Sequence, residues 1–322
     1  MKHYSVMLNE CINNLNIKSD GIYVDGTLGL GGHSSEILKK LTTGHLYAFD
    51  EDEMAIDYAK ERLSKINNNF TLIKSNFANM TEELKKYGIE KVDGILFDFG
   101  VSSPQIDNPD RGFSFMHDGS LDMRMDRSTK LTAADIVNTY SEAKLTEIFY
   151  KYGEEKKSKF IAQYIVKNRP ITTTLELVDV INDAVGNKYF NLNHPERRIF
   201  QALRIEVNQE LKVIETVLPQ VIDLLKPEGR CAIITFHSLE DRIVKQYFKT
   251  QSEVNELVKG LPEIPLEYKP KIKLMKLTSL SSRYPSLRPK YSIHSNKSPK
   301  SIERILRFFD LQSVINGLYC SS

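Results

Sequence analysis

A glycine-rich segment near the start of the chain has residue types that suit close contact with a nucleotide-like ligand. Glycines let the backbone approach a ligand closely at the N-terminus of a helix. A dinucleotide fingerprint, G-x-G-x-x-G, would begin at Gly29 and Gly31, but Ser34 stands where the third glycine belongs. The segment therefore predicts a ligand-binding loop and disfavours a nicotinamide cofactor. It reads Asp25-Gly26-Thr27-Leu28-Gly29-Leu30-Gly31-Gly32-His33-Ser34.

Asp50 is a second candidate for ligand binding, because it closes the next hydrophobic run, which is predicted to be a strand. In nucleotide-binding α/β folds, an acidic residue at this place accepts hydrogen bonds from the hydroxyl groups of a ribose. Several nucleotide-type ligands carry a ribose. Asp50 therefore supports a ligand that contains a ribose, but it does not distinguish one nucleotide-type ligand from another.

The segment after the fourth predicted strand contains the candidate catalytic residues Asp98, Ser103 and Pro104. Open α/β sheets bind their ligands at the carboxyl ends of the strands, which is where this segment lies. Enzymes that methylate amino groups of DNA bases have a D/N/S-P-P-Y tetrad here, and this chain continues Ser103-Pro104 with Gln105-Ile106. The match is half complete, so the segment is either an ordinary turn or the source of a hydrogen-bond acceptor for a target amine.

His237 is the last candidate catalytic residue, and it follows the fifth predicted strand at the same edge of the sheet. Ser238 and Asp241, three residues apart, resemble a helix capping box. A capping role for this segment is compatible with a role in the site, and the sequence favours neither.

The elements that must position these residues follow from hydrophobic periodicity. Short β-branched or aromatic runs alternate with helical patterns, which is typical of a doubly wound α/β domain with a parallel sheet. Between about residues 105 and 203 the pattern is helical without a convincing strand. We therefore predict a discontinuous domain of residues 1–104 and 205–322, interrupted by a helical domain of residues 105–204. The predicted strands are 21–25, 45–50, 70–74, 92–98 and 230–236, and the predicted helices are 52–66, 142–152, 155–168, 174–185 and 208–225.

Composition narrows the class of protein. The chain has 322 residues, of which 41% are hydrophobic and 27% charged, and no apolar run approaches the roughly 18 residues of a membrane span. The N-terminus lacks the apolar run of a signal peptide. Cys11, Cys231 and Cys320 are far apart and have no metal-ligand spacing. We therefore expect a soluble, cytoplasmic protein without a metal site or a membrane partner.

Positive charge is concentrated near the C-terminus. Between Glu263 and Asp310 there are eleven lysines and arginines but only four acidic residues, in a chain whose net charge is +2. Such a segment is either a solvated tail or a surface that contacts phosphates.

Six sequence blocks occur in order along the chain: Asp25–Ser34, Asp98–Gln105, Arg111–Phe115, Leu121–Asp126, Phe200–Ile205 and Phe236–Arg242. Together they resemble the bacterial ribosomal RNA small-subunit methyltransferase H family, also called MraW. The resemblance implies a Rossmann-like class I methyltransferase fold with an inserted helical domain. It also implies that a methyl group passes from S-adenosylmethionine to the exocyclic N4 amine of a cytidine in the decoding region of 16S ribosomal RNA.

The family pattern also implies a set of cofactor-binding residues in this sequence. The loop would face the methionine part of the cofactor, Asp50 the ribose and Phe77 the adenine, although a lone phenylalanine is more often a core residue. Asp98 would lie near the positively charged sulfonium. The implied cofactor-binding residues are Gly31, Gly32, His33, Asp50, Phe77, Asp98 and Gln105.

The C-terminus departs from the family pattern. The expected signature N-P-R-x-R-S-x-x-L-R is reduced to Ser298-Pro299-Lys300-Ser301 and Leu306-Arg307. The structure and role of residues 275–322 are therefore open, including a last strand expected at Ile302–Phe309. The oligomeric state is also open, as is the choice between free RNA and the small subunit as substrate. Two other functions remain as alternatives: a non-catalytic RNA-binding protein with a nucleotide-binding fold, and an NAD-dependent oxidoreductase.

Overall fold

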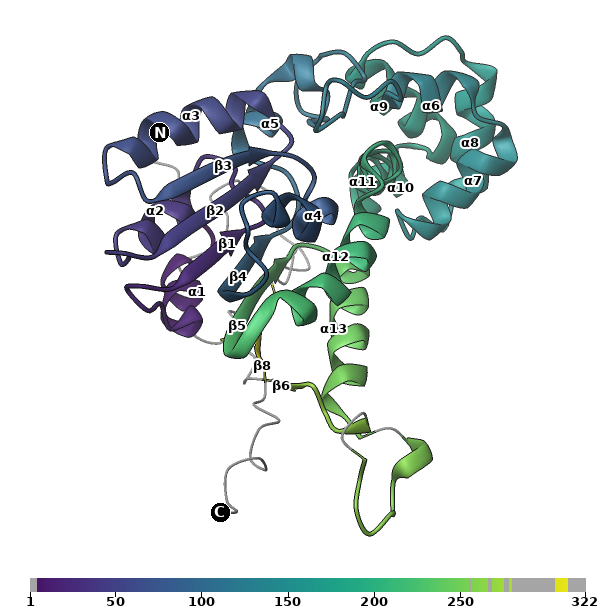
Figure 1. The fold of residues 1–322 in the computed structure, drawn as a ribbon. Helices are drawn as coiled ribbons and strands as arrows, with labels where there is room; N and C mark the ends of the chain where they lie inside the picture. Colours follow the sequence, from purple (N-terminus) through teal and green to yellow (C-terminus); the bar gives the residue numbers. More distant parts are fainter. Residues whose placement is uncertain (1–4, 255, 266–267, 275–277, 280–304, 312–322) are drawn as a thin grey trace, which may run out of the picture. The chain divides into compact units, whose positions relative to one another are not determined.

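The computed structural model describes residues 5–254, 256–265, 268–274, 278–279 and 305–311. The chain divides into two compact units (Figure 1). The first combines Met1–Gly100 with Val213–Ser322, and the second is Val101–Lys212. The sequence had placed the boundaries after residues 104 and 204.

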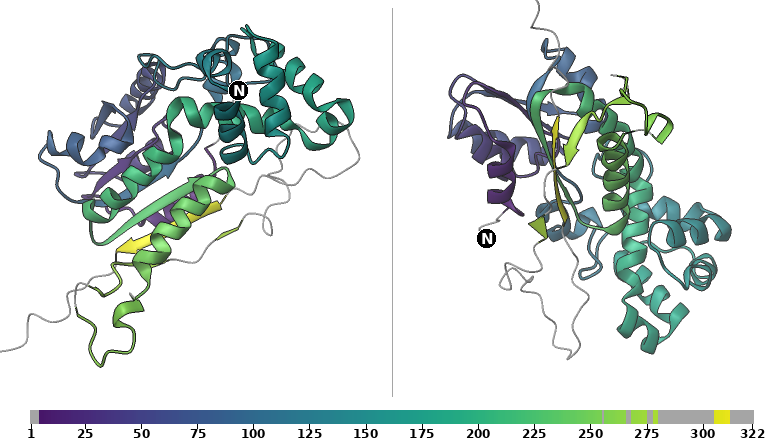
Figure 2. Two further views of the ribbon diagram at one scale, coloured as in Figure 1. Left: turned by 90° about the vertical axis from the view of Figure 1, so that its right-hand side faces the viewer. Right: turned by 90° about the horizontal axis from the view of Figure 1, so that it is seen from below.

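The first unit is built on one mostly parallel sheet. Its strands lie in the order β3-β2-β1-β4-β5-β8-β6, and β7 pairs with β8. The first five of these are parallel, whereas β8 runs antiparallel to β5. Figure 2 shows β8, in yellow, beside β5, although the two are far apart in the sequence. The strands are β1 (Ile22–Asp25), β2 (His45–Asp50), β3 (Phe70–Lys74), β4 (Val92–Asp98), β5 (Leu225–Thr235), β6 (Ile272–Leu274), β7 (Thr278–Ser279) and β8 (Ile305–Leu311).

Helices cover both faces of this sheet. Side chains alternate between the two faces along each strand, and the apolar ones on both faces need a layer of helices to bury them. Tyr23, Leu46 and Leu96 belong to one core cluster, which includes residues of α1, α2 and α3. Their neighbours Val24, Tyr47 and Phe97 belong to the cluster that includes α4, α12 and α13. The predicted doubly wound, Rossmann-like fold is confirmed. The helices are α1 (Leu8–Leu15), α2 (Gly32–Leu38), α3 (Glu53–Ser64), α4 (Met80–Lys85), α12 (Glu210–Leu224) and α13 (Ser238–Ser252).

The predicted turn between α12 and β5 is wrong in one respect. The strand begins at Leu225, opposite Val92, and only then does Arg230 pair with Gly94. Lys226–Gly229 therefore form an irregularity inside the strand, with Glu228 at a φ of 63°. Pro227 cannot donate a hydrogen bond to a neighbouring strand. The sequence therefore predicts a turn before the strand, where the structure has an irregularity within it.

The second unit is helical and has its own hydrophobic core. The core includes Ile136, Phe149, Ile161, Leu177 and Leu203, which come from five different helices. The three helices predicted in this region are confirmed as α7, α8 and α9, with small shifts at their ends. The helices of this unit are α5 (Ser103–Asp107), α6 (Ala133–Thr139), α7 (Glu142–Lys151), α8 (Ser158–Lys167), α9 (Thr174–Val185), α10 (Asn187–Asn193) and α11 (Pro195–Asn208).

Two of the sequence blocks within this unit hold an irregular loop in place. Arg111 is buried and donates hydrogen bonds to the carbonyl oxygens of Arg124 (2.9 Å) and Met125 (3.2 Å). Asp122 accepts two hydrogen bonds from the guanidinium of Arg124, at 2.6 and 2.9 Å. Gly112 has a φ of 70°, and a Cβ there would lie 2.1 Å from the carbonyl oxygen of Ser120. These contacts give the blocks a structural role.

Among the residues that the structure describes, no helix is both long enough and apolar enough to span a lipid bilayer.

Candidate active site

Three carboxylates close neighbouring strands at one edge of the sheet. Asp25 ends β1, Asp50 ends β2 and Asp98 ends β4. Because these strands are parallel, their carboxyl ends lie at the same edge. From β1 the chain passes to β2 on one side, and β4 lies on the other, so the order of strands reverses between β1 and β4. Open α/β sheets bind ligands at such a point.

The glycine loop has a backbone that only glycine adopts readily. Gly29 has a φ of 49° and Gly31 a φ of 72°. The backbone N–H of Gly29 donates to Asp50 Oδ2 at 2.8 Å, which ties the loop to the end of β2. A Cβ at Gly29 would meet no other atom within 4 Å, so this backbone is open on the side where a ligand can approach.

Ser34, which replaces the third glycine of a dinucleotide fingerprint, has a defined partner. Its hydroxyl donates to Asp25 Oδ2 at 2.7 Å, and both side chains are buried. Asp25 Oδ1 accepts the backbone N–H of Thr27 at 3.1 Å. Burial raises the pKa of Asp25, while these hydrogen bonds oppose that rise. Ser34 and Asp25 thus hold the loop in place, a role that the motif alone did not predict. An acid at the end of a buried strand, followed by a small hydroxyl residue in the next helix, is the sequence pattern that indicates it.

Asp50 is an acceptor for backbone groups and is ready to accept more hydrogen bonds. Its Oδ1 accepts the N–H of Asp52 at 2.9 Å, and Oδ2 accepts that of Gly29. Burial raises the pKa of Asp50 to about 6, although the two backbone hydrogen bonds act in the opposite direction. Each carboxylate oxygen can accept more than one hydrogen bond, so a ribose hydroxyl can be added to this arrangement.

His33 is 5% exposed, and a hydrogen bond to the backbone defines its tautomer. Its Nε2 lies 3.0 Å from the carbonyl oxygen of Val6, which can only accept, so Nε2 carries the hydrogen. Burial lowers the pKa of His33, so the ring is neutral at pH 7. Its Nδ1 is therefore an acceptor and lies 3.9 Å from Asp98 Oδ2. Two acceptors at this spacing can share one donor group of a ligand.

Residues near the N-terminus contribute to this loop, which the sequence analysis did not anticipate. Besides the Val6 carbonyl, the hydroxyl of Ser5 lies 1.8 Å from where a Cβ on Gly32 would be. Position 32 therefore requires glycine, because Ser5 lies where any larger side chain would have to go. Only the folded chain brings these residues together, so no local pattern could have indicated the contact.

Phe77 lies in a short 3₁₀ helix, Phe77–Asn79, just after β3. Its ring contacts Phe97 and Phe99, with centroid distances of 5.4 and 5.6 Å. It is partly buried against the core, whereas its two partners are fully or almost fully buried. Phe77 is thus both a core residue and a partly exposed aromatic ring at the carboxyl edge of the sheet. Its role toward an adenine stays a prediction.

The segment after β4 crosses the boundary between the two units. In the first unit, the N–H of Asp98 donates to Thr27 Oγ1 at 2.6 Å, and Gly100 has a φ of 106°. In the second unit, Ser103 and Pro104 are the first two residues of α5. Gln105 is buried and its Oε1 accepts the N–H of Ser102 at 3.0 Å. Gln105 thus has a role at the start of its helix, and its predicted contact with the cofactor stays a prediction.

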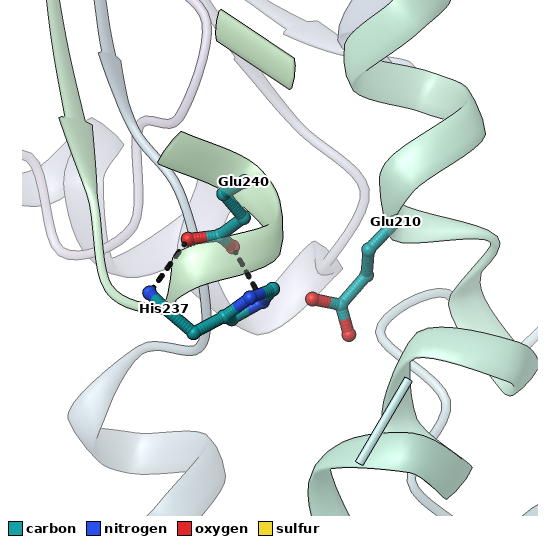
Figure 3. A group of neighbouring side chains, drawn as sticks. All are labelled: Glu210, His237 and Glu240. Carbon is teal, nitrogen blue, oxygen red and sulfur yellow. Dashed lines mark hydrogen bonds and ion pairs between the residues drawn. The ribbon is translucent and has the colours of Figure 1, made fainter. Parts of the chain in front are cut away.

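His237 and Glu240 form the start of α13 (Figure 3). Glu240 is buried, and its Oε2 accepts the N–H groups of Phe236 (2.7 Å) and His237 (3.3 Å). Its Oε1 lies 3.2 Å from Nε2 of His237. The predicted capping box of Ser238 and Asp241 is therefore wrong by one residue. His237 is the N-cap, because Glu240, at the third helical position, reaches back to the backbone.

Glu210, also drawn in Figure 3, belongs to the second unit. Within that unit it accepts two hydrogen bonds from the guanidinium of Arg204, at 2.8 and 2.9 Å. This fork geometry joins the end of α11 to the start of α12. Arg204 lies in the block Phe200–Ile205, so this block also has a structural role.

Comparison with known proteins identifies the family. The model of the MraW methylase family matches residues 1–303. The ribosomal RNA small subunit methyltransferase H of Exiguobacterium sibiricum is 53% identical over 278 residues, which cover 85% of this chain and 89% of that protein.

Solved structures are similar only at a distance. An rRNA methylase from Streptococcus thermophilus has a TM-score of 0.40 and 13% identity, covering 97% of this chain and 98% of that one. A SAM-dependent O-methyltransferase from Thermotoga maritima has a TM-score of 0.39 and 11% identity, covering 97% and 68%. The identification of the family therefore rests on the sequence matches and not on the solved structures. The match to the family model over residues 1–303 shows that the chain belongs to the MraW methylase family.

Proposed function

We propose that this chain transfers a methyl group from S-adenosylmethionine to the exocyclic N4 amine of a cytidine in the decoding region of 16S ribosomal RNA. Membership of a methylase family carries the type of reaction. The position of the active site is supported by the carboxyl ends of β1, β2 and β4. The glycine loop, Asp50 and Asp98 lie there, at one edge of the sheet.

The residues at this edge suit S-adenosylmethionine, which supplies an activated methyl group on a positively charged sulfur. The open backbone at Gly29 and the acceptor Asp50 fit a nucleoside, and Phe77 offers an aromatic face for a base. The carboxylate of Asp98 offsets positive charge. Nδ1 of His33 and Oδ2 of Asp98 can accept hydrogen bonds from an ammonium group. Gly31, Gly32 and Gln105 complete the proposed set.

The chemistry depends mainly on positioning. The exocyclic amine of cytosine is a weak nucleophile, because its lone pair is delocalised into the ring. Holding the amine nitrogen and the methyl carbon about 3–3.5 Å apart contributes roughly 7–11 kcal/mol. An acceptor that contacts the amine adds to this as positive charge develops. Asp98, Ser103 and Pro104 are the candidates that we propose to provide the acceptor and shape the site, with His237 as a further candidate.

The substrate is ribosomal RNA of the small subunit, and we propose that the helical unit recognises it. A paired cytosine hides its amine, so the target base must be unstacked or single-stranded. The basic residues between 263 and 310 supply charge for phosphate contacts. A reaction on ribosomal RNA takes place in the cytoplasm of a bacterial cell, so a cytoplasmic location remains part of this proposal.

Two alternatives are less consistent with the molecule. In a nicotinamide-binding loop the third glycine allows close packing of helix and strand, whereas here Ser34 fills that place and bonds to Asp25. A non-catalytic RNA-binding protein with a nucleotide-binding fold would not transfer a methyl group. Calorimetry with S-adenosylmethionine and with NAD, followed by methyl incorporation into small-subunit RNA, separates the three functions, and we expect S-adenosylmethionine to bind and the RNA to be methylated.

Mass spectrometry of small-subunit RNA nucleosides tests the reaction itself. Cells without the gene should lack N4-methylation at one cytidine of the decoding region. Reintroducing the gene should restore it, and the Asp98→Asn variant should not. An unchanged set of nucleosides in the deletion strain would refute the proposed function.

A further inference from the structure

We infer that the exposed face of α8 binds single-stranded ribosomal RNA by stacking bases on Phe160 and Tyr164. This inference rests on the proposed function and names a contact surface for the same substrate. The two aromatic rings lie one helical turn apart and are not part of the core of the second unit. Phe160 is 58% exposed and Tyr164 is 38% exposed.

The helix α8 is amphipathic, and its two faces differ clearly. Ser158, Ile161, Ala162 and Ile165 are buried and face the core of the unit. Phe160, Gln163, Tyr164 and Lys167 are all exposed and follow i, i+3, i+4, i+7 spacing, so they lie on one face. The outer face of a surface helix is typically charged or polar, whereas the outer face of α8 carries two aromatic rings one turn apart.

Charge identifies the partner as an anion. From Lys156 to Leu175 the chain has five basic residues and no acidic one. Two of the five have structural roles. Lys157 donates to the carbonyl oxygen of Val185 and lies 4.2 Å from the centre of the Tyr189 ring, and Arg169 donates to the carbonyl oxygen of Val137.

The other three are available to a partner. Lys156, Lys159 and Lys167 are exposed and form no hydrogen bond or ion pair with any residue that the structure describes. By contrast, Lys144 of the adjacent helix α7 pairs with Glu147 at 3.2 Å. The exposed acids Glu154 and Glu176 flank this segment, and Asp179 and Asp183 belong to α9, so the positive charge is confined to residues 156–175.

Exposed aromatic rings between unpaired lysines fit single-stranded nucleic acid better than they fit a protein partner. Every base presents a flat face that stacks on an aromatic side chain, and phosphates attract the lysines on either side of the two rings. A double helix would hide its base faces from both rings. The cytidine that receives the methyl group must itself be unpaired, so single-stranded RNA lies beside the target.

The test uses the full-length protein and small-subunit ribosomal RNA as the probe. The double variant Phe160→Ala/Tyr164→Ala should weaken RNA binding at least about tenfold, because one stacked base contributes on the order of 1–3 kcal/mol. The variant Phe160→Tyr/Tyr164→Phe keeps both rings and should bind like the parent. The triple variant Lys156→Gln/Lys159→Gln/Lys167→Gln should reduce the slope of log affinity against log salt by about 2.

A matched control comes from the first unit. Tyr58 of α3 is 53% exposed and Lys60 is exposed on the same helix, so Tyr58→Ala/Lys60→Gln removes a similar ring and charge. It should leave RNA affinity unchanged. Calorimetry with S-adenosylmethionine and thermal melting should give parental values for all variants of α8, because the replaced side chains are exposed and outside the cofactor loop.

The outcomes separate this inference from the proposed function. If the parent does not methylate small-subunit RNA, the proposed function fails. If the parent methylates the RNA and the Phe160→Ala/Tyr164→Ala variant binds it with parental affinity, the function stands and the role of α8 is refuted. A variant that binds RNA normally but loses a protein partner would assign the face to protein contacts instead and would equally refute the inference.

Discussion

Asp50 links cofactor binding to pH at the scale of a single residue. Burial raises its pKa to about 6, and protonation removes its charge and turns one acceptor oxygen into an O–H donor. The affinity for S-adenosylmethionine should therefore fall as the pH drops through about 6. Asp50→Asn should remove this dependence and weaken binding above pH 6 by about 1.5–3 kcal/mol. Calorimetry on both sides of pH 6 measures both effects.

The same substitution has two opposite effects on the fold. The pKa of Asp50 in the folded protein lies above its ordinary value, so its ionisation opposes folding as the pH rises through about 6, and Asn removes this cost. Asn also replaces one acceptor oxygen by an NH2 group and so loses the hydrogen bond from either Gly29 or Asp52, so the melting temperature is measured beside the affinity. An Asp50→Asn protein that melts normally and binds S-adenosylmethionine with parental affinity at every pH would contradict the assignment.

Asp98 should affect both donor binding and the chemical step. Asp98→Asn keeps the shape of the side chain but removes its charge, so we expect kcat to fall and KM for S-adenosylmethionine to rise. Ser103→Ala should mainly lower kcat, because we propose that Ser103 shapes the place where the amine meets the methyl group. Single-turnover methylation and thermal melts distinguish these effects from unfolding. Parental rates in a normally folded Asp98→Asn enzyme would show that the active site lies elsewhere.

At the scale of elements, Asp93 joins the starts of three strands. It accepts a hydrogen bond from Lys226 Nζ at 2.7 Å and from the N–H of Ile22 at 2.9 Å, and Lys18 lies 3.6 Å away. Lys226 lies in the irregular part of β5, so this contact links that part to the start of β4. Burial alone would raise the pKa of Asp93, but the hydrogen bonds and the two lysines together lower it.

Replacing Asp93 should therefore reduce stability in a pH-dependent manner. Asp93→Asn should lower the free energy of unfolding by about 1–3 kcal/mol at neutral pH. Because its pKa is lowered in the folded state, the stabilisation is present above the ordinary value of 3.8 and disappears as the pH falls through the lowered value. Denaturant unfolding of parent and variant should thus differ at neutral pH and converge in acid. The exposed pair of Lys65 and Glu61 provides the control, since its loss should change little.

At the scale of the whole molecule, the basic C-terminal segment should matter for RNA but not for the cofactor. Lys269, Lys271 and Lys273 are exposed, while Arg283 and Arg288 lie outside the described residues, as does Cys320. Replacing these five basic residues by glutamine should weaken RNA binding and flatten its salt dependence by about 3 in slope. Affinity for S-adenosylmethionine should not change. An unaltered salt slope would make the segment a solvated tail.

The sequence by itself determined the sheet and the places where chemistry is possible. Strands β1 to β4 and helices such as α9 have the predicted bounds to within a residue, because their periodicity is local. The glycine loop and the acids Asp50 and Asp98 follow from the same reasoning, since parallel strands bring their carboxyl ends together. The last expected strand is present as β8, from Ile305 to Leu311, and residues 302–304 lie outside the described part of the chain.

Only the tertiary structure decided how those residues are held. The Val6 carbonyl fixes the tautomer of His33, Ser34 bonds to Asp25, and Glu240 makes His237 the N-cap in place of Ser238. The contact of His33 with Val6 joins residues that no short pattern connects, and the two local contacts depend on which polar groups become buried when helices pack on the sheet. The irregularity at Lys226–Gly229 likewise lies inside the strand only because β5 pairs with β4 on both sides of it. Local periodicity specifies elements, whereas the partners of buried polar groups are set only when the elements meet.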